Sequence, residues 1–204
     1  MITTIIFDWG GVLAPADNAS TARKLSRKYN LDFSHLKRRL GELEAQNSIS
    51  SDYSGFTKGM EQEFNIPGKE AIKCLLDYPA GPGFEFARSI KGRFKLCILS
   101  NQMHFKTQDI RNSNDLSFFD CILFSSEVGL QKPSKEMFHL LLEQINEKPE
   151  SCLFIDDNID NINSAISLGF RGLHSQDIEK LNMGVDNAVN NAEDFLNKDA
   201  INDK

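Results

Sequence analysis

Five short segments of the chain are apolar at nearly every position: residues 3–7, 94–99, 121–124, 152–155 and 170–173. A strand that is covered on both faces has such a continuous apolar run, whereas a strand with one exposed face alternates between apolar and polar residues. We therefore predict that these segments are the strands of a mostly parallel, five-stranded sheet with helices on both faces.

Between the later strands, apolar residues recur with helical spacing. One set follows the i, i+3, i+4, i+7 pattern and consists of Phe138, Leu141, Leu142 and Ile145. Ser134 is the predicted N-cap of this helix. A second stripe contains Ile159, Ile162 and Ile166, and Gly169 is expected just past its end. Strands that alternate with helices indicate βαβ units and a doubly wound α/β fold.

The first and second strands are separated by far more than one crossover helix. Residues 15–81 contain few β-branched clusters and favour helices, with the clearest pieces at residues 25–29, 36–43 and 56–64. We predict a small inserted helical domain over residues 15–81 and an α/β core over residues 1–14 and 82–204. The Pro-Ala-Gly-Pro-Gly run at residues 79–83 is the predicted hinge.

Composition agrees with a globular protein that contains such an insertion. The length of 204 residues corresponds to about 1.4 domains at roughly 150 residues per domain. Hydrophobic residues make up 40% of the chain and charged residues 25%, which excludes a disordered chain or a coiled coil. With 23 Lys and Arg against 29 Asp and Glu, the net charge of −6 argues against nucleic acid and anionic membranes as partners.

The sequence also predicts a cytoplasmic protein. Its longest apolar runs fall far short of the roughly 20 residues that cross a bilayer, so we expect no membrane segment. The first residues lack the basic region of a secretory signal. The four cysteines are widely spaced and form no Cys-x-x-Cys pair, as expected in a reducing compartment. Nothing in the pattern indicates the oligomeric state.

Polar side chains follow the predicted strands at their carboxyl ends, which is where open α/β sheets bind ligands. They are Asp8, Ser100, Asn101, Asp156 and Asp157, and Lys132 stands shortly before the helix after the third strand. Carboxylate oxygens are the ligands that Mg²⁺ prefers, whereas a hydroxyl and an ammonium group suit phosphate oxygens. The sequence therefore predicts a site for a divalent cation and a phosphate together.

These segments resemble the four motifs of the haloacid dehalogenase (HAD) superfamily, in the family's order. Residues 5–13 (IIFDWGGVL) resemble motif I, 98–101 (ILSN) motif II, 132–133 (KP) motif III and 153–157 (LFIDD) motif IV. The resemblance covers residues 3 to about 174. It implies a Rossmann-like core, and the insertion between motifs I and II is similar to the family's C1 cap.

The resemblance also implies a metal site. Asp8 would attack phosphorus and form an aspartyl-phosphate, with one of its oxygens on Mg²⁺. The backbone carbonyl of Gly10 and the side chain of Asp157 would be further ligands. Asp156 would contact the metal directly or support a ligand, and Asn161 would position that loop.

A phosphate site is implied beside the metal. Ser100 and Lys132 would hold the transferring phosphoryl group and offset its charge. Asn101 and Gly11 would complete the phosphate-binding residues. The bond between Lys132 and Pro133 is expected to be cis, as is common at this motif. The implied partner is a small phosphorylated metabolite.

One residue departs from the family's usual pattern. Phosphatases of the family carry a second Asp two residues after the nucleophile as a general acid, and here that position is Gly10. General acid catalysis contributes about 10²–10⁴-fold, so its loss would slow hydrolysis without preventing phosphate binding. A subset of the family with an Asp-x-Gly motif I acts on sugar phosphates and resembles this chain.

Two other functions remain open on the sequence alone. Haloacid dehalogenases also lack the second Asp, but they use no Mg²⁺, and the pair Asp156 and Asp157 favours a metal. A non-catalytic protein that binds a phosphorylated ligand is the other alternative. A response-regulator receiver fits less well because its acidic pair should follow the first strand. The leading hypothesis is a Mg²⁺-dependent HAD phosphatase that hydrolyses a small phosphate monoester such as a sugar phosphate.

Overall fold

The computed structural model describes residues 1–15, 18–76 and 81–175, so the last part of the predicted core lies outside the described residues. Its centre is a five-stranded sheet in the order β3-β2-β1-β4-β5, and every strand pairing is parallel. The strands are β1 Thr4–Phe7, β2 Lys95–Ser100, β3 Cys121–Phe124, β4 Cys152–Asp156 and β5 Arg171–His174. The predicted doubly wound α/β fold is confirmed, with strand ends within one residue of those expected.

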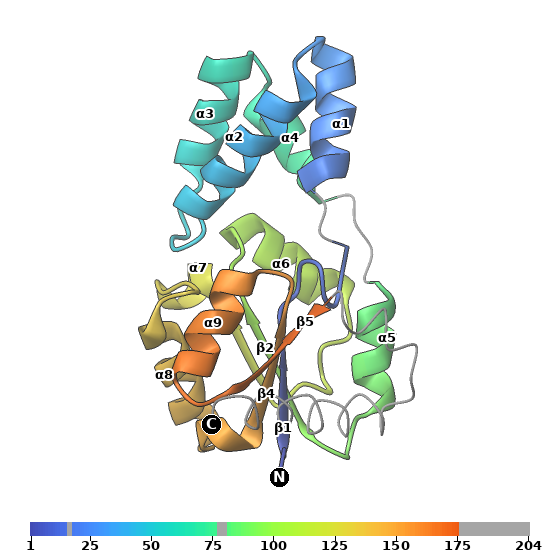
Figure 1. Ribbon diagram of the computed structural model, residues 1–204. Helices are drawn as coiled ribbons and strands as arrows, with labels where there is room; N and C mark the ends of the chain where they lie inside the picture. Colours follow the sequence, from blue (N-terminus) through green and yellow to red (C-terminus); the bar gives the residue numbers. More distant parts are fainter. Residues whose placement is uncertain (16–17, 77–80, 176–204) are drawn as a thin grey trace, which may run out of the picture.

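Both faces of the sheet are buried, as the continuous apolar runs indicated. Ile5 and Phe7 of β1 point into one hydrophobic cluster and Ile6 into another. Figure 1 shows α5 on one side of the sheet and α8 and α9 on the other, and residues of these helices belong to the two clusters. The core helices are α5 Pro82–Ser89, α6 His104–Ser113, α7 Ser125–Val128, α8 Lys135–Ile145, the 3₁₀ turn Pro149–Ser151 and α9 Ile159–Ser167.

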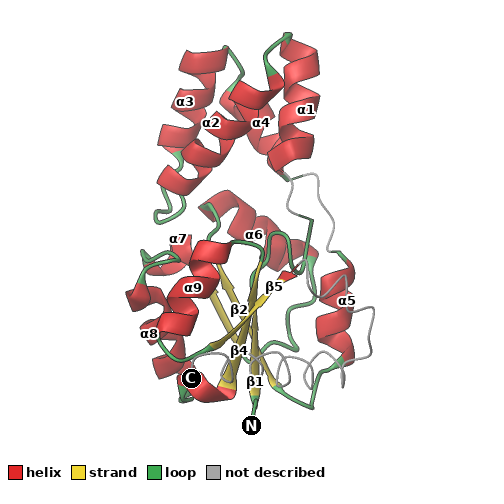
Figure 2. Cartoon of the chain, in the orientation of Figure 1, coloured by secondary structure: helices red, strands yellow, loops and turns green. Residues whose placement is uncertain are grey.

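Of the described helices between β1 and β2, the first four form a bundle beyond the carboxyl ends of the strands (Figures 1 and 2). They are α1 Asn18–Tyr29, α2 Phe33–Gln46, α3 Ser54–Phe64 and α4 Gly68–Leu75. The bundle has a hydrophobic cluster of its own, in which Leu36, Phe56 and Met60 are fully buried. Met103 and Phe105 from the start of α6 belong to the same cluster, so the bundle packs on the core through this helix.

Two helix predictions are only partly right. Ser134 occupies the N-cap position of α8, but its hydroxyl donates to the Glu136 carboxylate instead of accepting a backbone N–H. Gly169 follows α9 with φ +96, as predicted. The expected stripe on α9 is buried only at Ile162, because Ile159 and Ile166 are 55% and 48% exposed. This helix therefore packs on the sheet through a narrower face than its sequence indicated.

No helix in the described part of the chain is both long enough and apolar enough to cross a membrane.

The strand order indicates where a ligand would bind. From β1 the chain proceeds outward through β2 and β3 on one side, and then returns to β4 and β5 on the other. In open α/β sheets ligands bind at the point where the strand order reverses, and here that point lies at the carboxyl ends of β1 and β4.

Candidate active site

Asp8 is the first residue after β1 and lies in the middle of this edge of the sheet. Its backbone N–H donates to the Ile155 carbonyl of β4 at 2.9 Å, which continues the strand pairing by one residue. Its carboxylate Oδ1 accepts a hydrogen bond from the Trp9 N–H at 2.7 Å and lies 3.0 Å from Lys132 Nζ. The side chain of Asp8 is therefore held in one orientation in an almost fully buried position.

A tight turn follows Asp8 and brings its backbone against the side chain of Asp157, the residue after β4. The Trp9 carbonyl accepts hydrogen bonds from the N–H groups of Leu13 and Ala14 at 2.9 and 2.8 Å. Gly11 has φ +74, and a Cβ atom there would lie 2.4 Å from Asp157 Oδ2. At Gly10, by contrast, a Cβ atom would meet no heavy atom within 4 Å. Only a glycine fits at position 11, whereas position 10 has free space beside it.

Three carboxylates converge where β1 and β4 end. Each of Asp8, Asp156 and Asp157 offers an oxygen atom, and these oxygens lie within 4.8 Å of one another. Asp156 is fully buried and accepts hydrogen bonds from the Asn158 N–H at 2.8 Å and from Asn161 Nδ2 at 3.1 and 3.2 Å. Such a cluster is costly without a cation because like charges repel one another in a partly dehydrated site.

The pKa values of two of these carboxylates are raised, mainly by burial and in smaller part by the charge of Asp156. Burial raises the pKa of Asp8 to about 6, although the nearby Lys132 ammonium opposes the shift. Partial burial against the turn, together with the charge of Asp156, also raises the pKa of Asp157, which is exposed on its other side. Both shifts mean that the negative form of the carboxylate is poorly stabilised by the protein alone. A bound cation would stabilise it.

Lys132 is buried between two of these carboxylates. It is 3% exposed, and its Nζ donates to Asp156 Oδ2 at 2.6 Å in addition to its contact with Asp8. Burial lowers the pKa of Lys132, but Asp8 and Asp156 more than offset this and leave the pKa above its ordinary value. Lys132 is therefore a fixed positive charge at the centre of the site.

The backbone of Lys132 is fixed by Asn101. The Asn101 side chain donates from Nδ2 to the Lys132 carbonyl at 2.8 Å and accepts from the Lys132 N–H at 2.9 Å. The bond between Lys132 and Pro133 is cis, as expected. Ser100 is fully buried at the end of β2, and its Oγ accepts a hydrogen bond from Gln102 Nε2 at 3.2 Å. The Asn101 side chain thus joins the loop after β2 to the loop between α7 and α8, which carries the lysine.

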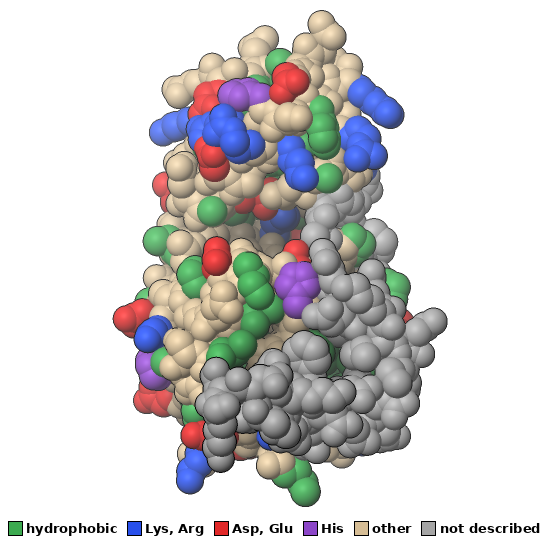
Figure 3. All heavy atoms as spheres, in the orientation of Figure 1, with side chains coloured by type: hydrophobic (Ala, Val, Ile, Leu, Met, Phe, Trp, Pro, Cys, Tyr) green, Lys and Arg blue, Asp and Glu red, His purple; other side chains and the backbone are tan. Residues whose placement is uncertain are grey.

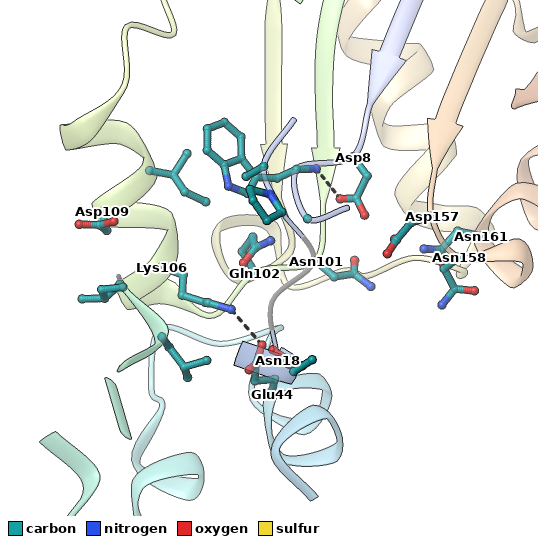
Figure 4. Close-up of a pocket in the computed structure, with 18 of the residues that line it drawn as sticks. Asp8, Asn18, Glu44, Asn101, Gln102, Lys106, Asp109, Asp157, Asn158 and Asn161 are labelled. Carbon is teal, nitrogen blue, oxygen red and sulfur yellow. Dashed lines mark hydrogen bonds and ion pairs between the residues drawn. The ribbon is translucent and has the colours of Figure 1, made fainter. Parts of the chain in front are cut away.

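A cavity of about 500 Å³ lies between this edge of the sheet and the helical bundle. Asp8, Gly10, Asn101 and Asp157 line it on the core side, and Figure 4 shows Asp8 and Asp157 facing each other there. In the space-filling view of Figure 3, the surface narrows and is hollowed between the bundle and the core. The cavity gives a ligand access to the carboxylate cluster.

The opposite wall of the cavity contains residues that sequence reasoning missed. Glu44 of α2 and Lys106 of α6 form an ion pair of 3.0 Å across the junction between bundle and core. Gln102 and Asn18 also line the cavity. Gln102 directly follows the Ser-Asn pair of the second motif, which was a usable signal. Glu44 and Asn18 gave none, because their placement depends on how the bundle packs on α6.

The sequence-predicted residues thus lie together at one edge of the sheet. Asp8, Asp156, Asp157 and Lys132 are in direct contact or within 4.8 Å through their charged groups. The remaining four surround them: Gly10 and Gly11 in the turn after β1, and Ser100 and Asn101 at the end of β2. In the structure Asn101 contacts the protein backbone through both atoms of its amide. Its predicted contact with phosphate stays a prediction.

Comparison with known proteins places the chain among hydrolases. A model of the haloacid dehalogenase-like hydrolases matches residues 2–169. Drimenol cyclase drtB of Aspergillus calidoustus is 28% identical over 191 residues, which cover 87% of this chain but 35% of that protein. The chain therefore spans about a third of that relative. The phosphorylated carbohydrates phosphatase of Thermotoga maritima is 25% identical over 197 residues, which cover 88% of this chain and 87% of that protein.

A solved structure has the same fold. The HAD family enzyme bt-2542 of Bacteroides thetaiotaomicron, in complex with magnesium and inorganic phosphate, superimposes with a TM-score of 0.69 at 17% identity. The superposition covers 85% of this chain and 94% of that one.

Proposed function

Since this chain belongs to the haloacid dehalogenase-like hydrolases, we propose that it hydrolyses phosphate monoesters of small metabolites with Mg²⁺ as its cofactor. One observation carries the proposal: Asp8 lies beside both a buried ammonium group and an acidic cluster. The cluster can hold a cation, and the ammonium can neutralise a phosphate. The magnesium and phosphate bound to bt-2542 and the activity named for the Thermotoga maritima relative support the same reaction class.

The residues present fit a magnesium ion. Asp8 and Asp157 would supply carboxylate oxygens and Gly10 its backbone carbonyl, all of them hard oxygen ligands. Both oxygens of Asp156 already accept hydrogen bonds, from Lys132, Asn158 and Asn161, which favours a supporting role for this residue. When bound, Mg²⁺ would offset the negative charge of the phosphate and help to orient it.

The chain's own residues account for the chemical steps. The Asp8 carboxylate attacks phosphorus, the bond to the leaving oxygen breaks, and the phosphoryl group is transferred to Asp8. Lys132 and Ser100 bind the transferring oxygens and stabilise their charge. Water then attacks the phosphorus of the aspartyl-phosphate and releases inorganic phosphate. Because Trp9 and Lys132 fix Asp8 Oδ1, the nucleophile needs no rearrangement before the attack.

We propose that residues 15–81 act as a cap over this site. The four helices stand over the carboxyl ends of the strands, and the cavity beneath them is about 500 Å³. That volume suits a low-molecular-weight substrate, such as the sugar phosphate expected from the sequence. Contacts such as Glu44 with Lys106 tie the cap to the core.

The direct test is hydrolysis of 4-nitrophenyl phosphate with Mg²⁺ or with a chelator. We expect release of nitrophenol and phosphate only when Mg²⁺ is present. A 2-haloacid with chelator present is the second arm, because haloacid dehalogenases also lack the second Asp that Gly10 replaces here. Halide release there, without phosphatase activity, would favour the dehalogenase. Failure of both arms, with Mg²⁺ still bound, would favour a non-catalytic binding protein.

Magnesium is expected to stabilise the protein against heat, and more strongly at pH 7.5 than at pH 5. The pKa of Asp8 is raised from 3.8 to about 6, so between these two pH values the folded metal-free protein binds more protons than the unfolded chain. Its free energy of unfolding therefore falls as pH rises through this range. The cation offsets this loss once Asp8 is ionised. Melting curves with and without Mg²⁺ measure the shift. An equal shift at both pH values, or its persistence in Asp157→Asn, would contradict the assignment.

Gly11→Ala is expected to weaken Mg²⁺ binding by about 10–100-fold, because the added Cβ displaces the Asp157 carboxylate. Gly92→Ala is the matched control. Gly92 also has a positive φ, of +80, but its Cβ would meet nothing within 4 Å. Both variants should lose stability by about 1–2 kcal/mol from backbone strain. Calorimetric titration with Mg²⁺ separates them, and equal losses of affinity would count against the site.

A further inference from the structure

Gly10 leaves an empty position beside the nucleophile. It lines the cavity two residues after Asp8, and a Cβ atom there would meet no heavy atom within 4 Å. A proton donor for the leaving oxygen of a phosphate ester would have to stand close to Asp8 and face the cavity. The residue at this position carries no side chain, so the donor must come from elsewhere or the reaction must proceed without one.

No other acidic group among the described residues that line the cavity is placed to replace it. Glu44 lies on the bundle side of the cavity, where it is paired with Lys106 at 3.0 Å. Asp109 lies across the cavity from Asp8 (Figure 4). Asp157 belongs to the carboxylate cluster that would bind the metal.

Three lysines lie at or beside the cavity: Lys132, Lys106 and Lys37. Lys37 belongs to α2 on the bundle side and is exposed, whereas the other two are engaged in ion pairs. Lys132 is shared by Asp8 and Asp156 in a buried ion-pair network, and loss of its proton would leave two carboxylates without a partner. Lys106 is paired with Glu44. On the core side of the cavity, the described residues therefore stabilise the charge of the transferring phosphoryl group and supply no side chain placed as a proton donor for the leaving oxygen.

Resting on the function proposed above, we infer that the substrates of this chain are phosphates of acidic leaving groups, which depart as anions without protonation by the protein. The anomeric oxygen of a sugar 1-phosphate, an enol oxygen and the carboxylate of an acyl phosphate share this chemistry. Phosphates of ordinary alcohols, such as the 6-phosphate of the same sugar, lack it and react slowly.

The step balances without a protein acid. A bond forms between an Asp8 carboxylate oxygen and phosphorus, and the bond from phosphorus to the leaving oxygen breaks with its electron pair remaining on that oxygen. The departing anion takes a proton from water. A second water then attacks the phosphorus of the aspartyl-phosphate, which releases phosphate, restores the Asp8 carboxylate and gives a proton to the solvent.

The test compares kcat/KM for a series of substituted phenyl phosphates with Mg²⁺ present. This constant reports the transfer to Asp8, whereas kcat can be limited by later attack of water on the aspartyl-phosphate. For the wild type we expect kcat/KM to fall steeply as the leaving phenol becomes less acidic. Gly10→Asp, whose new side chain has room, should flatten this dependence. Gly10→Asn fills the same space without an acid and should keep the wild-type slope, whatever its absolute rate.

The second arm compares two sugar phosphates, glucose 1-phosphate and glucose 6-phosphate. Acetyl phosphate is added as a probe for acyl phosphates, the substrates whose leaving group is a carboxylate. The wild type should prefer the 1-phosphate over the 6-phosphate by about 10²-fold or more, and Gly10→Asp should reduce this preference by about 10-fold or more. A flat phenyl series and equal rates on the two sugar phosphates in the wild type would overturn the inference. Inertness toward 4-nitrophenyl phosphate would instead overturn the proposed phosphatase activity, and this inference with it.

Discussion

Asp8→Asn is expected to reduce Mg²⁺-dependent phosphate release by on the order of 10⁴-fold or more, which is the scale of loss when a covalent nucleophile is removed. An amide cannot form the aspartyl-phosphate, and it also removes a negative charge from the metal site. The fold should tolerate the change, because Lys132 keeps its 2.6 Å contact with Asp156 and the buried Asp8 carboxylate is itself poorly stabilised. The measurement is the initial rate on 4-nitrophenyl phosphate.

The control for this variant is Asp115→Asn, which changes an exposed carboxylate in the loop after α6 that does not line the cavity. It should retain the wild-type rate. Because an asparagine side chain can slowly convert to aspartate, the mass of the Asp8→Asn protein should be checked after the assay. A rate within 10-fold of wild type, in a protein whose mass shows that the amide is intact, would exclude a covalent role for this residue.

Lys132→Met is expected to affect both activity and stability. Loss of the ammonium group should lower kcat/KM by about 10²–10³-fold, as for other groups that stabilise transition-state charge. It should also lower the free energy of unfolding by about 3–5 kcal/mol, because Asp8 and Asp156 then lose the cation that they share. Urea unfolding in the absence of metal measures the second effect.

A double variant separates these two roles. Adding Asp156→Asn to Lys132→Met removes one of the unpaired buried charges and leaves a polar group that can still bind Asn161. We expect much of the stability to return while the activity stays low. Unchanged stability in Lys132→Met, or recovered activity in the double variant, would contradict the arrangement described here.

The strands could be predicted from the sequence because the sheet is buried on both faces. A continuous apolar run such as Cys121–Phe124 is too short for a buried helix and is typical of a strand covered on both faces, and its ends fell within one residue of the structure. The prediction for α9 was less accurate. Helical spacing at Ile159 and Ile166 indicates a shared helix face, but spacing alone does not say how wide a face the sheet covers.

The core side of the candidate site could be located for the same reason. Residues directly after parallel strands must lie at one edge of the sheet, so the sequence alone predicts that Asp8, Asp156 and Asp157 meet. The cap side could not be predicted. Glu44 and Lys106 are 62 positions apart, and their contact depends on the packing of Phe105 into the bundle, which no local pattern encodes.

Asn101 illustrates an intermediate case. Its position after β2 predicted a residue at the site, but its amide is engaged by the backbone of Lys132. The sequence pattern indicated proximity to the lysine of the site correctly. It did not reveal that the side chain holds the lysine loop, because that partner lies 31 positions away in the chain.

The central claim is that the Asp8 carboxylate becomes phosphorylated during turnover. The most direct measurement quenches the reaction with 4-nitrophenyl phosphate and Mg²⁺ within the first turnovers and treats the protein with borohydride, which reduces an aspartyl-phosphate to homoserine. Peptide mass spectrometry then locates the change. We predict homoserine at position 8, dependent on Mg²⁺ and absent without substrate. Turnover with an unmodified Asp8, or with the change at another residue, would contradict the claim.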